Sequence, residues 1–97
     1  MLFAVLCKDK PDHIHIRMEN RPRHLEWLDG LNEKGTLKIA GPFLDEQEKP
    51  CGSMLLIEAK DQASAEAIAA QDPYGKAGLF EKVEVKPYKW LYNNPGV

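Results

Sequence analysis

The chain has 97 residues, of which 43% are hydrophobic and 29% charged, and its formal net charge is −2. This length leaves room for one core, so we expect residues 1–97 to form a single domain. Lysine and arginine are scattered among acidic residues without a basic stripe, which argues against a nucleic-acid partner. No apolar run has the length of a membrane span or of a signal-peptide core, so we expect a cytoplasmic protein that does not bind membranes.

The two cysteines and two of the histidines carry no recognisable motif. Cys7 and Cys51 are enough for one disulfide, but nothing in the sequence indicates export, so we expect free thiols in a reducing compartment. His13 and His15 stand two residues apart, and such residues do not share a helix face. Without further ligands nearby they predict solvent-exposed side chains and no metal site.

The first third of the chain predicts a strand followed by a helix. Residues 2–7 form a continuous apolar run, which is typical of a strand covered on both faces. Helical periodicity follows from about Asp12 to a natural stop at Gly35. Pro22 interrupts this segment, so either the helix kinks near residues 20–21 or a short helix ends there and a second begins.

The remaining chain predicts three strands and a second helix. The strand signals are apolar or alternating runs between glycine, proline and polar residues: residues 36–44 ending in Gly41-Pro42, residues 53–59, and residues 79–88. Residues 45–52 predict a polar loop. Asp61 is the expected N-cap of an alanine-rich helix over residues 63–71. The segment Asp72-Pro73-Tyr74-Gly75 then opens another turn.

This βαββαβ order predicts an α+β fold of the ferredoxin-like kind, an antiparallel four-stranded sheet with two helices on one face. The first and third strands are apolar on both faces, although two helices cover only one face of such a sheet. A second copy of the sheet is the simplest cover for the other face, so we expect a homodimer that packs sheet to sheet.

The topology also predicts which distant residues meet. The two helices run antiparallel, so His24 early in the first helix is expected near Asp72 at the end of the second. The same rim of the sheet is expected to gather further candidate residues: Gly41, Pro42, Ser53 and Tyr74. A hydrogen bond between His24 and the inward-pointing Asp72 would fix the imidazole tautomer and raise its basicity, as a general base requires.

Other roles stay open for these residues. Asp72 before Pro73 is also a good N-cap for the next turn, and the two roles are compatible because a carboxylate has two oxygens. Arg21 and Arg23 are either ordinary surface charge or an anion-binding arm at the pocket mouth. Ser53 is a polar pocket wall or only a strand residue, since no elbow motif surrounds it to make a nucleophile. Tyr74 either caps the pocket or packs under the loop.

The motifs that carry these residues resemble the YCII family over nearly the whole chain and in the same order: Arg21-Pro22-Arg23-His24-Leu25, Ala40-Gly41-Pro42, Gly52-Ser53, Gln71-Asp72-Pro73-Tyr74, Ala77-Gly78-Leu79-Phe80 and Val83-Glu84-Val85-Lys86-Pro87-Tyr88. The resemblance implies a dimeric α/β barrel built from ferredoxin-like protomers. It also implies that His24 and Asp72 match the family's proposed His–Asp active pair. The family is similar to muconolactone isomerases, and one branch acts as a chloromuconolactone dehalogenase.

Two functions are compatible with these residues. The first is a cofactor-independent enzyme, an isomerase or a lyase of the dehalogenase type, in which His24 moves a proton next to the carbonyl of a small lactone or enol acid. Asp72 would orient His24, and the expected substrate-binding residues are Arg21, Gly41, Pro42, Ser53 and Tyr74. No nucleotide-binding glycine motif is present, and we expect no cofactor and no metal. The alternative is a dimer that binds or senses a small acidic metabolite without turnover. A third reading, a purely structural dimerisation domain, leaves the inward acid with no task beyond capping.

The segment after the last strand is aromatic. Large side chains replace the charged ones at Tyr88, Trp90, Leu91 and Tyr92. Aromatic residues are favoured at interfaces, so we predict that residues 88–92 pack on the partner protomer and close one side of the pocket or interface. The competing prediction is that Trp90 and Leu91 fold back over a helix of their own chain.

Overall fold

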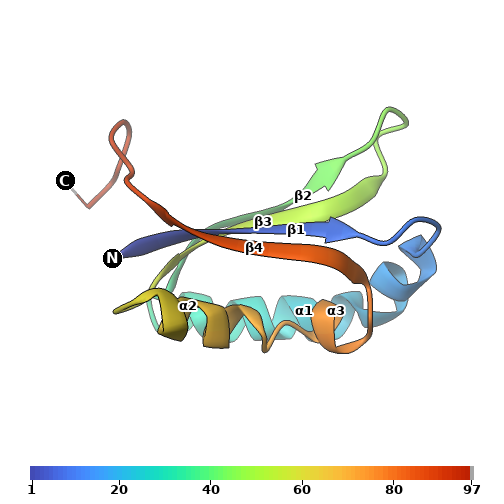
Figure 1. Ribbon diagram of the computed structural model, residues 1–97, viewed down its shortest axis with the longest axis horizontal. Helices are drawn as coiled ribbons and strands as arrows, with labels where there is room; N and C mark the ends of the chain where they lie inside the picture. The colour runs from blue at the N-terminus through green and yellow to red at the C-terminus, as the bar shows by residue number, and fades with distance from the viewer. Residues whose placement is uncertain (97) are drawn as a thin grey trace.

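The computed structural model describes residues 1–96 and contains one four-stranded antiparallel sheet with helices on one face (Figure 1). The elements are β1 (Leu2–Asp9), α1 (Ile14–Glu33), β2 (Leu37–Leu44), β3 (Pro50–Glu58), α2 (Gln62–Ala69), α3 (Pro73–Lys76) and β4 (Phe80–Tyr88). The strand order β2-β3-β1-β4 is that of a ferredoxin-like fold, which confirms the predicted fold of the protomer. Among residues 1–96, no helix has the length and apolar character needed to cross a membrane.

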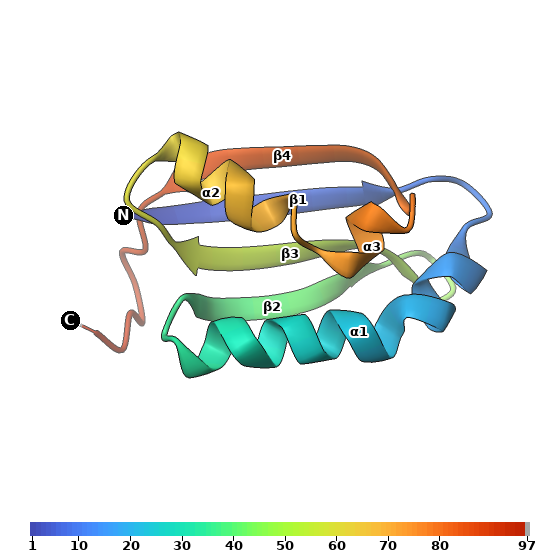
Figure 2. The same ribbon diagram turned by 90° about the horizontal axis from the view of Figure 1, so that it is seen from below.

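The core lies between the sheet and the helices. Alternate residues of the two central strands point to the helical side and are buried there: Phe3, Val5 and Cys7 of β1, and Leu55 and Ile57 of β3. Figure 2 looks at this side, where α1 runs along β2 while α2 and α3 follow one another on the other half of the sheet. The two helical rows therefore run side by side across the layer that holds the core.

The β2–β3 hairpin is longer than the sequence predicts. The strand predicted over residues 36–44 is β2, and Pro42 is tolerated inside it because β2 is an edge strand, where a proline can turn its missing N–H away from the ladder. Pairing continues to Leu44 opposite Pro50. The predicted loop over residues 45–52 is therefore wrong in its second half, since β3 begins at Pro50, three residues before the predicted start.

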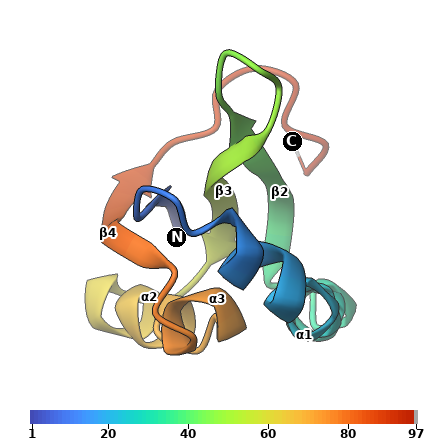
Figure 3. The ribbon, with the colours of Figure 1, turned by 90° about the vertical axis from the view of Figure 1, so that its right-hand side faces the viewer.

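Helix α1 passes through Pro22 without ending, so the prediction of two separate helices is wrong and the continuous helix is confirmed. Figure 3 looks along the later part of α1 and shows its first turns inclined to the rest, as a proline inside a helix requires. The side-chain amide of Asn20 donates to the Ile16 carbonyl (2.9 Å) near this bend. Gly35, with a φ of +76°, follows the helix in the left-handed region.

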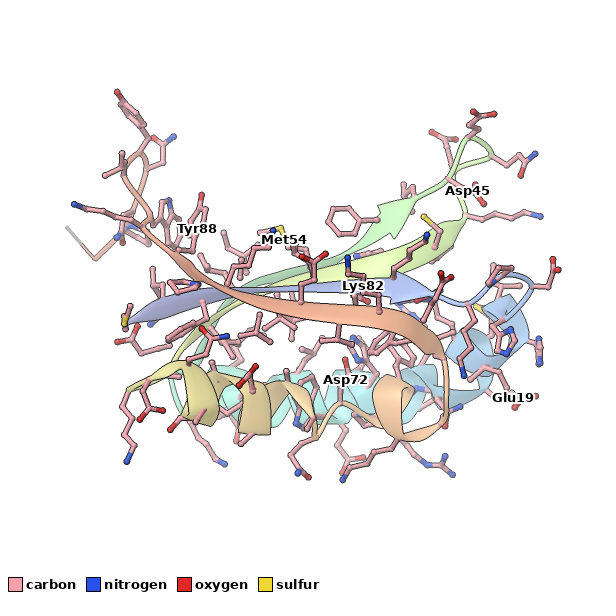
Figure 4. The ribbon with its side chains drawn as sticks, in the orientation of Figure 1. Glu19, Asp45, Met54, Asp72, Lys82 and Tyr88 are labelled. Carbon is pink, nitrogen blue, oxygen red and sulfur yellow. The ribbon has the colours of Figure 1, made fainter. Side chains whose placement is uncertain are left out.

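The face of the sheet opposite the helices is apolar along its centre and carries large exposed side chains. Ile39 (43% exposed), Phe43 (45%) and Tyr88 (47%) lie on this open face. Figure 4 shows Met54 and Tyr88 pointing away from the helices, whereas Asp72 lies on the helical side. Within residues 1–96 no helix covers the open face, where the apolar residues of β1 and β3 lie beside the charged Lys82, Glu84 and Lys86 of β4.

The tail after β4 rises on the side of the open face, away from the helices (Figure 1). The indole of Trp90 donates to the Tyr92 carbonyl (2.6 Å), so the tail turns on itself. Leu91 and Tyr92 are 70% and 83% exposed. The prediction that Trp90 and Leu91 fold over a helix of their own chain is wrong, because the tail leaves β4 on the opposite side of the sheet. Packing on a partner stays a prediction.

A close approach of β1 to β3 gives a test of the central strands. A Cβ atom added to Gly52 would lie 2.5 Å from the Cys7 carbonyl oxygen, whereas one added to Gly30 of α1 would meet nothing within 4 Å. We expect Gly52→Ala to lower the free energy of unfolding by about 1–3 kcal/mol through overpacking. The matched Gly30→Ala variant should raise it by up to about 1 kcal/mol, because alanine is the better helix former. Urea unfolding of both variants checks this, and equal shifts would contradict it.

Candidate active site

A cavity of about 220 Å³ lies between α1, the β2–β3 hairpin and α3. Its lining comes from four elements: Arg17, Met18, Arg21, His24, Leu25 and Leu28 of α1, Ala40, Gly41 and Pro42 of β2, Pro50, Ser53 and Leu55 of β3, and Tyr74 of α3. The expected convergence is present, because Arg21, Gly41, Pro42, Ser53 and Tyr74 all line the cavity, and their role in substrate binding stays a prediction. Asp72 is not part of the lining and lies behind His24.

His24 and Asp72 are hydrogen-bonded, as the antiparallel helices predicted. The distance from Nδ1 of His24 to Oδ1 of Asp72 is 2.8 Å, and both side chains are buried. The same Oδ1 accepts the backbone N–H of Tyr74 at 3.0 Å, so Asp72 is also the N-cap of α3. Both roles use one oxygen, whereas the sequence suggested one oxygen for each.

This pairing fixes the chemistry of the imidazole. An ionised carboxylate can only accept hydrogen bonds, so Nδ1 of His24 carries the proton and Nε2 is the basic atom of the neutral ring. Nε2 has no hydrogen-bond partner within residues 1–96, and no enclosed side-chain nitrogen or oxygen of these residues lacks one. Nε2 is therefore open to the cavity that His24 lines. The Tyr74 ring stacks on the imidazole with a centroid separation of 3.9 Å and holds its orientation.

A second buried polar group lies beside the first and includes residues that the sequence analysis missed. Arg17 forms a two-pronged ion pair with Asp9, with Nε and Nη2 each 2.8 Å from a carboxylate oxygen. Nη2 also donates to the Ser53 hydroxyl at 3.0 Å. The guanidinium carbon lies 4.6 Å from the centroid of the Tyr74 ring, which is the ring that also stacks on His24.

Asp9 keeps Arg17 charged inside the protein. Burial by itself would lower the pKa of the Arg17 guanidinium, but the hydrogen bonds and the negative charge of Asp9 outweigh burial and raise this pKa. A signal for Arg17 was present in the sequence, because residues seven apart lie two turns apart on one helix face and Arg17 precedes His24 by seven. Asp9 ends β1 at the same rim.

The buried polar residues of the described chain are concentrated at this cavity: Asp9, Arg17, Asn20, His24, Ser53 and Asp72. All except Asn20 belong to the two hydrogen-bonded groups just described. Buried polar groups cost stability unless they are paired, and a small core gains more from apolar side chains at these positions. Their concentration at one cavity is therefore a functional signal.

Other candidate residues lie elsewhere. Arg23 donates to the side-chain oxygen of Asn20 and does not line the cavity, so of the two arginines around Pro22 only Arg21 reaches its wall. The His15 side chain is exposed as predicted, while His13 is half-buried with Nδ1 near the Pro11 carbonyl. Within residues 1–96, no group of three or more potential ligand residues could hold a metal ion.

The model of the YCII-related domain family matches residues 1–89 of the chain. Protein YciI from Escherichia coli is 36% identical over 98 aligned positions, which cover 95% of this chain and 100% of that protein. The residues matched by the family model include both hydrogen-bonded groups of the cavity.

Solved structures are similar as well. The 5-chloro-2-hydroxyhydroquinone dehydrochlorinase TftG of Burkholderia phenoliruptrix, in complex with 2,5-dihydroxybenzoquinone, superimposes with a TM-score of 0.84 at 31% identity, over 97% of this chain and 99% of that one. An antibiotic biosynthesis monooxygenase matches with a TM-score of 0.50 at 16% identity over 92% and 99% of the two chains. The second likeness concerns the fold alone.

The two N-cap aspartates of the chain allow a matched test of the His24–Asp72 bond. Asp61 caps α2 at the surface through the Ser64 N–H, and Asp72 caps α3 while also holding His24. We expect Asp61→Ala to lower the free energy of unfolding by about 1 kcal/mol, the usual cost of a lost cap. Asp72→Ala should cost about 1.5–3 kcal/mol more, because it also removes a buried charged partner. Denaturant titration of both variants measures the difference, and equal losses would mean that the bond adds nothing.

The two cysteines give a test of burial at the base of the site. Both thiols are free, as predicted. Burial raises the pKa of Cys7 to about 12, helped by the negative charge of Asp72, so its thiolate is scarce at pH 8. Cys51 is exposed. We expect iodoacetamide at pH 8 to label the native protein once, at Cys51, and to leave Cys51→Ser unlabelled until it is unfolded. Rapid labelling of native Cys51→Ser would contradict the buried position of Cys7.

Proposed function

Because the chain belongs to the YCII-related domain family, we propose that its cavity is the active site of a cofactor-independent enzyme that uses His24 and Asp72 for general acid–base chemistry. The observation that carries the proposal is a buried histidine whose Nδ1 is held by a carboxylate while its Nε2 faces a cavity. A general base needs this arrangement, because one nitrogen must be fixed for the other to reach a substrate proton.

The chemistry is a proton transfer next to a carbonyl group. Nε2 of His24 takes the proton from the carbon next to the carbonyl. The C–H electron pair forms a double bond to the carbonyl carbon, and the C=O π pair moves to the oxygen, which becomes negatively charged. Asp72 stabilises the imidazolium that forms. Return of the proton to another carbon of the conjugated system re-forms the carbonyl and completes an isomerisation. In a dehydrochlorination the oxygen re-forms its carbonyl, the C=C electron pair shifts toward the neighbouring carbon and expels chloride from it, and His24 releases its proton to solvent.

The substrate class follows from the cavity and from the similar proteins. The cavity holds about 220 Å³ and combines apolar walls with two arginines, which suits a small carbonyl compound, lactone or enol acid. TftG is named for its action on 5-chloro-2-hydroxyhydroquinone and was solved with 2,5-dihydroxybenzoquinone. Small hydroxylated rings are therefore the first compounds to test with this chain.

His24 should be required for turnover and not for binding. We expect His24→Gln to lower kcat by about 10²–10⁴-fold, the usual contribution of a general base, with little change in ligand affinity. The substrates to assay are small lactones, enol acids and 5-chloro-2-hydroxyhydroquinone, followed by ultraviolet absorbance and chloride release. His15→Gln, the same substitution at an exposed histidine that does not line the cavity, is the control.

Two outcomes would overturn the enzymatic proposal. Full turnover by His24→Gln would remove the histidine from the chemistry. Binding of these compounds without turnover of any of them would favour the alternative, a dimer that senses or carries a small acidic metabolite.

We further propose that the protein is a homodimer joined through the open face, in the manner of a dimeric α/β barrel. The support is the apolar, helix-free side of the sheet with Ile39 and Phe43 exposed on it. Sedimentation at micromolar concentration should give twice the chain mass of 11.0 kDa. Phe43→Glu should shift the protein to monomer, because it places a charge in the interface. Asn32→Glu on the exposed side of α1 adds the same charge and should not. A monomeric wild-type protein would refute the dimer.

A further inference from the structure

Arg17 has unused donors at the cavity. An arginine side chain carries five N–H groups, and three of them are engaged here, by the two oxygens of Asp9 and by Ser53. No acceptor within residues 1–96 forms a well-aligned hydrogen bond with the two N–H groups of Nη1, although the Tyr74 hydroxyl is near enough to help raise the pKa of Arg17. Nη1 is also not enclosed, because no enclosed side-chain nitrogen or oxygen of these residues lacks a partner. Since Arg17 lines the cavity, its free donors are offered to whatever occupies that space.

Ser53 adds a second donor at the same point. Its oxygen accepts from Arg17, so its own proton must point elsewhere, and no acceptor for it lies within residues 1–96. The residue is 2% exposed and lines the cavity, so its hydroxyl proton is available to a ligand in the cavity. Tyr74 contributes a further neutral donor there, because burial raises the pKa of its hydroxyl against the opposing pull of Arg17.

The lining contains no carboxylate. Asp9 is occupied by Arg17, Asp72 is occupied by His24 and the Tyr74 N–H, and both lie behind the side chains that they hold. Apart from the exposed Arg21, the remaining side chains of the wall are apolar: Met18, Leu25, Leu28, Ala40, Pro42, Pro50 and Leu55. A cavity with hydrogen-bond donors on one wall and apolar side chains on the other is complementary to a flat carbon skeleton that carries a negatively charged oxygen at one end.

We infer that Nη1 of Arg17 and the hydroxyl of Ser53 form an oxyanion-binding pair, and that the ligand of this cavity is the anion of a single oxygenated ring. The inference rests on the proposed function only for the part played by His24. Arg17 and His24 both line the cavity and both contact the Tyr74 ring, at 4.6 Å and 3.9 Å from its centroid, so the two groups belong to one ligand site. As His24 removes the proton, the charge that develops on the ring oxygen meets donors that are already in place.

Holding the guanidinium between Asp9 and the cavity serves this role. The ion pair removes the freedom of a long side chain before the ligand arrives, so little ordering remains to be done on binding. A lysine at this position would keep the charge and lose the fork that binds Asp9 on one side and the ligand on the other.

Binding of two related quinones tests the inference without any need for turnover. 2,5-Dihydroxybenzoquinone is ionised at pH 7.5, whereas 2,5-dimethoxybenzoquinone has the same ring and is neutral. We expect calorimetric titration of the full-length protein to show binding of the first compound and at least about 10-fold weaker binding of the second, since a hydrogen bond to a charged group is lost.

Variants then assign the effect to the pair. Ser53→Ala should weaken binding of 2,5-dihydroxybenzoquinone about 10-fold or more and leave the neutral compound unaffected. Ser64→Ala, which keeps the backbone cap of α2, is the matched control and should bind like the wild type. Arg17→Lys should bind more weakly than Ser53→Ala. If Arg17→Lys does not fold, as judged by circular dichroism, the comparison of Ser53→Ala with Ser64→Ala and of the two quinones still tests the inference.

The inference is overturned if the wild-type protein binds neither quinone at millimolar concentration, if it binds both equally, or if folded Ser53→Ala binds the anion like the wild type. Failure of the proposed function gives different results. Anion binding that depends on Ser53, with no turnover of any compound, would support the oxyanion-binding pair and refute the enzymatic function. Turnover that depends on His24 but not on Ser53 would support the enzymatic function and refute the oxyanion-binding pair.

Discussion

The bond between Asp72 and His24 ties three elements of this small domain together. One carboxylate oxygen accepts from the imidazole of α1 and from the backbone that starts α3, at the point where the chain leaves α2. A buried carboxylate is costly unless both its charge and its lone pairs are used, so this geometry constrains the end of α2, the start of α3 and the middle of α1 together. The position of the cavity follows, because His24 and Tyr74 form two of its walls.

The second polar group repeats the same design on the neighbouring wall. Asp9 holds Arg17 as Asp72 holds His24, and in each case the acid lies away from the cavity while its partner lines it. The two groups meet at the Tyr74 ring, which contacts both Arg17 and His24. One wall thus carries a base and the next a set of donors, and their separation is fixed by two turns of a single helix.

The sequence predicted the architecture and the first polar group because both depend on topology. Once the order βαββαβ is recognised, the antiparallel helices place His24 near Asp72 without any side-chain detail. Arg17 was missed because an arginine in a helix is most often solvated, and its burial here depends on Asp9, which belongs to the end of β1 and not to the helix. The start of β3 was missed because Pro50 in a polar segment indicates a loop, although a proline is tolerated as the first residue of a strand.

The structure also limits which cavity the aromatic tail after β4 can reach. Tyr88 pairs with Leu2 at the start of β1, whereas Asp9 at the other end of β1 marks the rim with the cavity. The tail therefore cannot close the cavity of its own chain, since the length of the strand separates them. A partner's tail can reach that rim only if the two-fold axis reverses the strand direction between the two sheets.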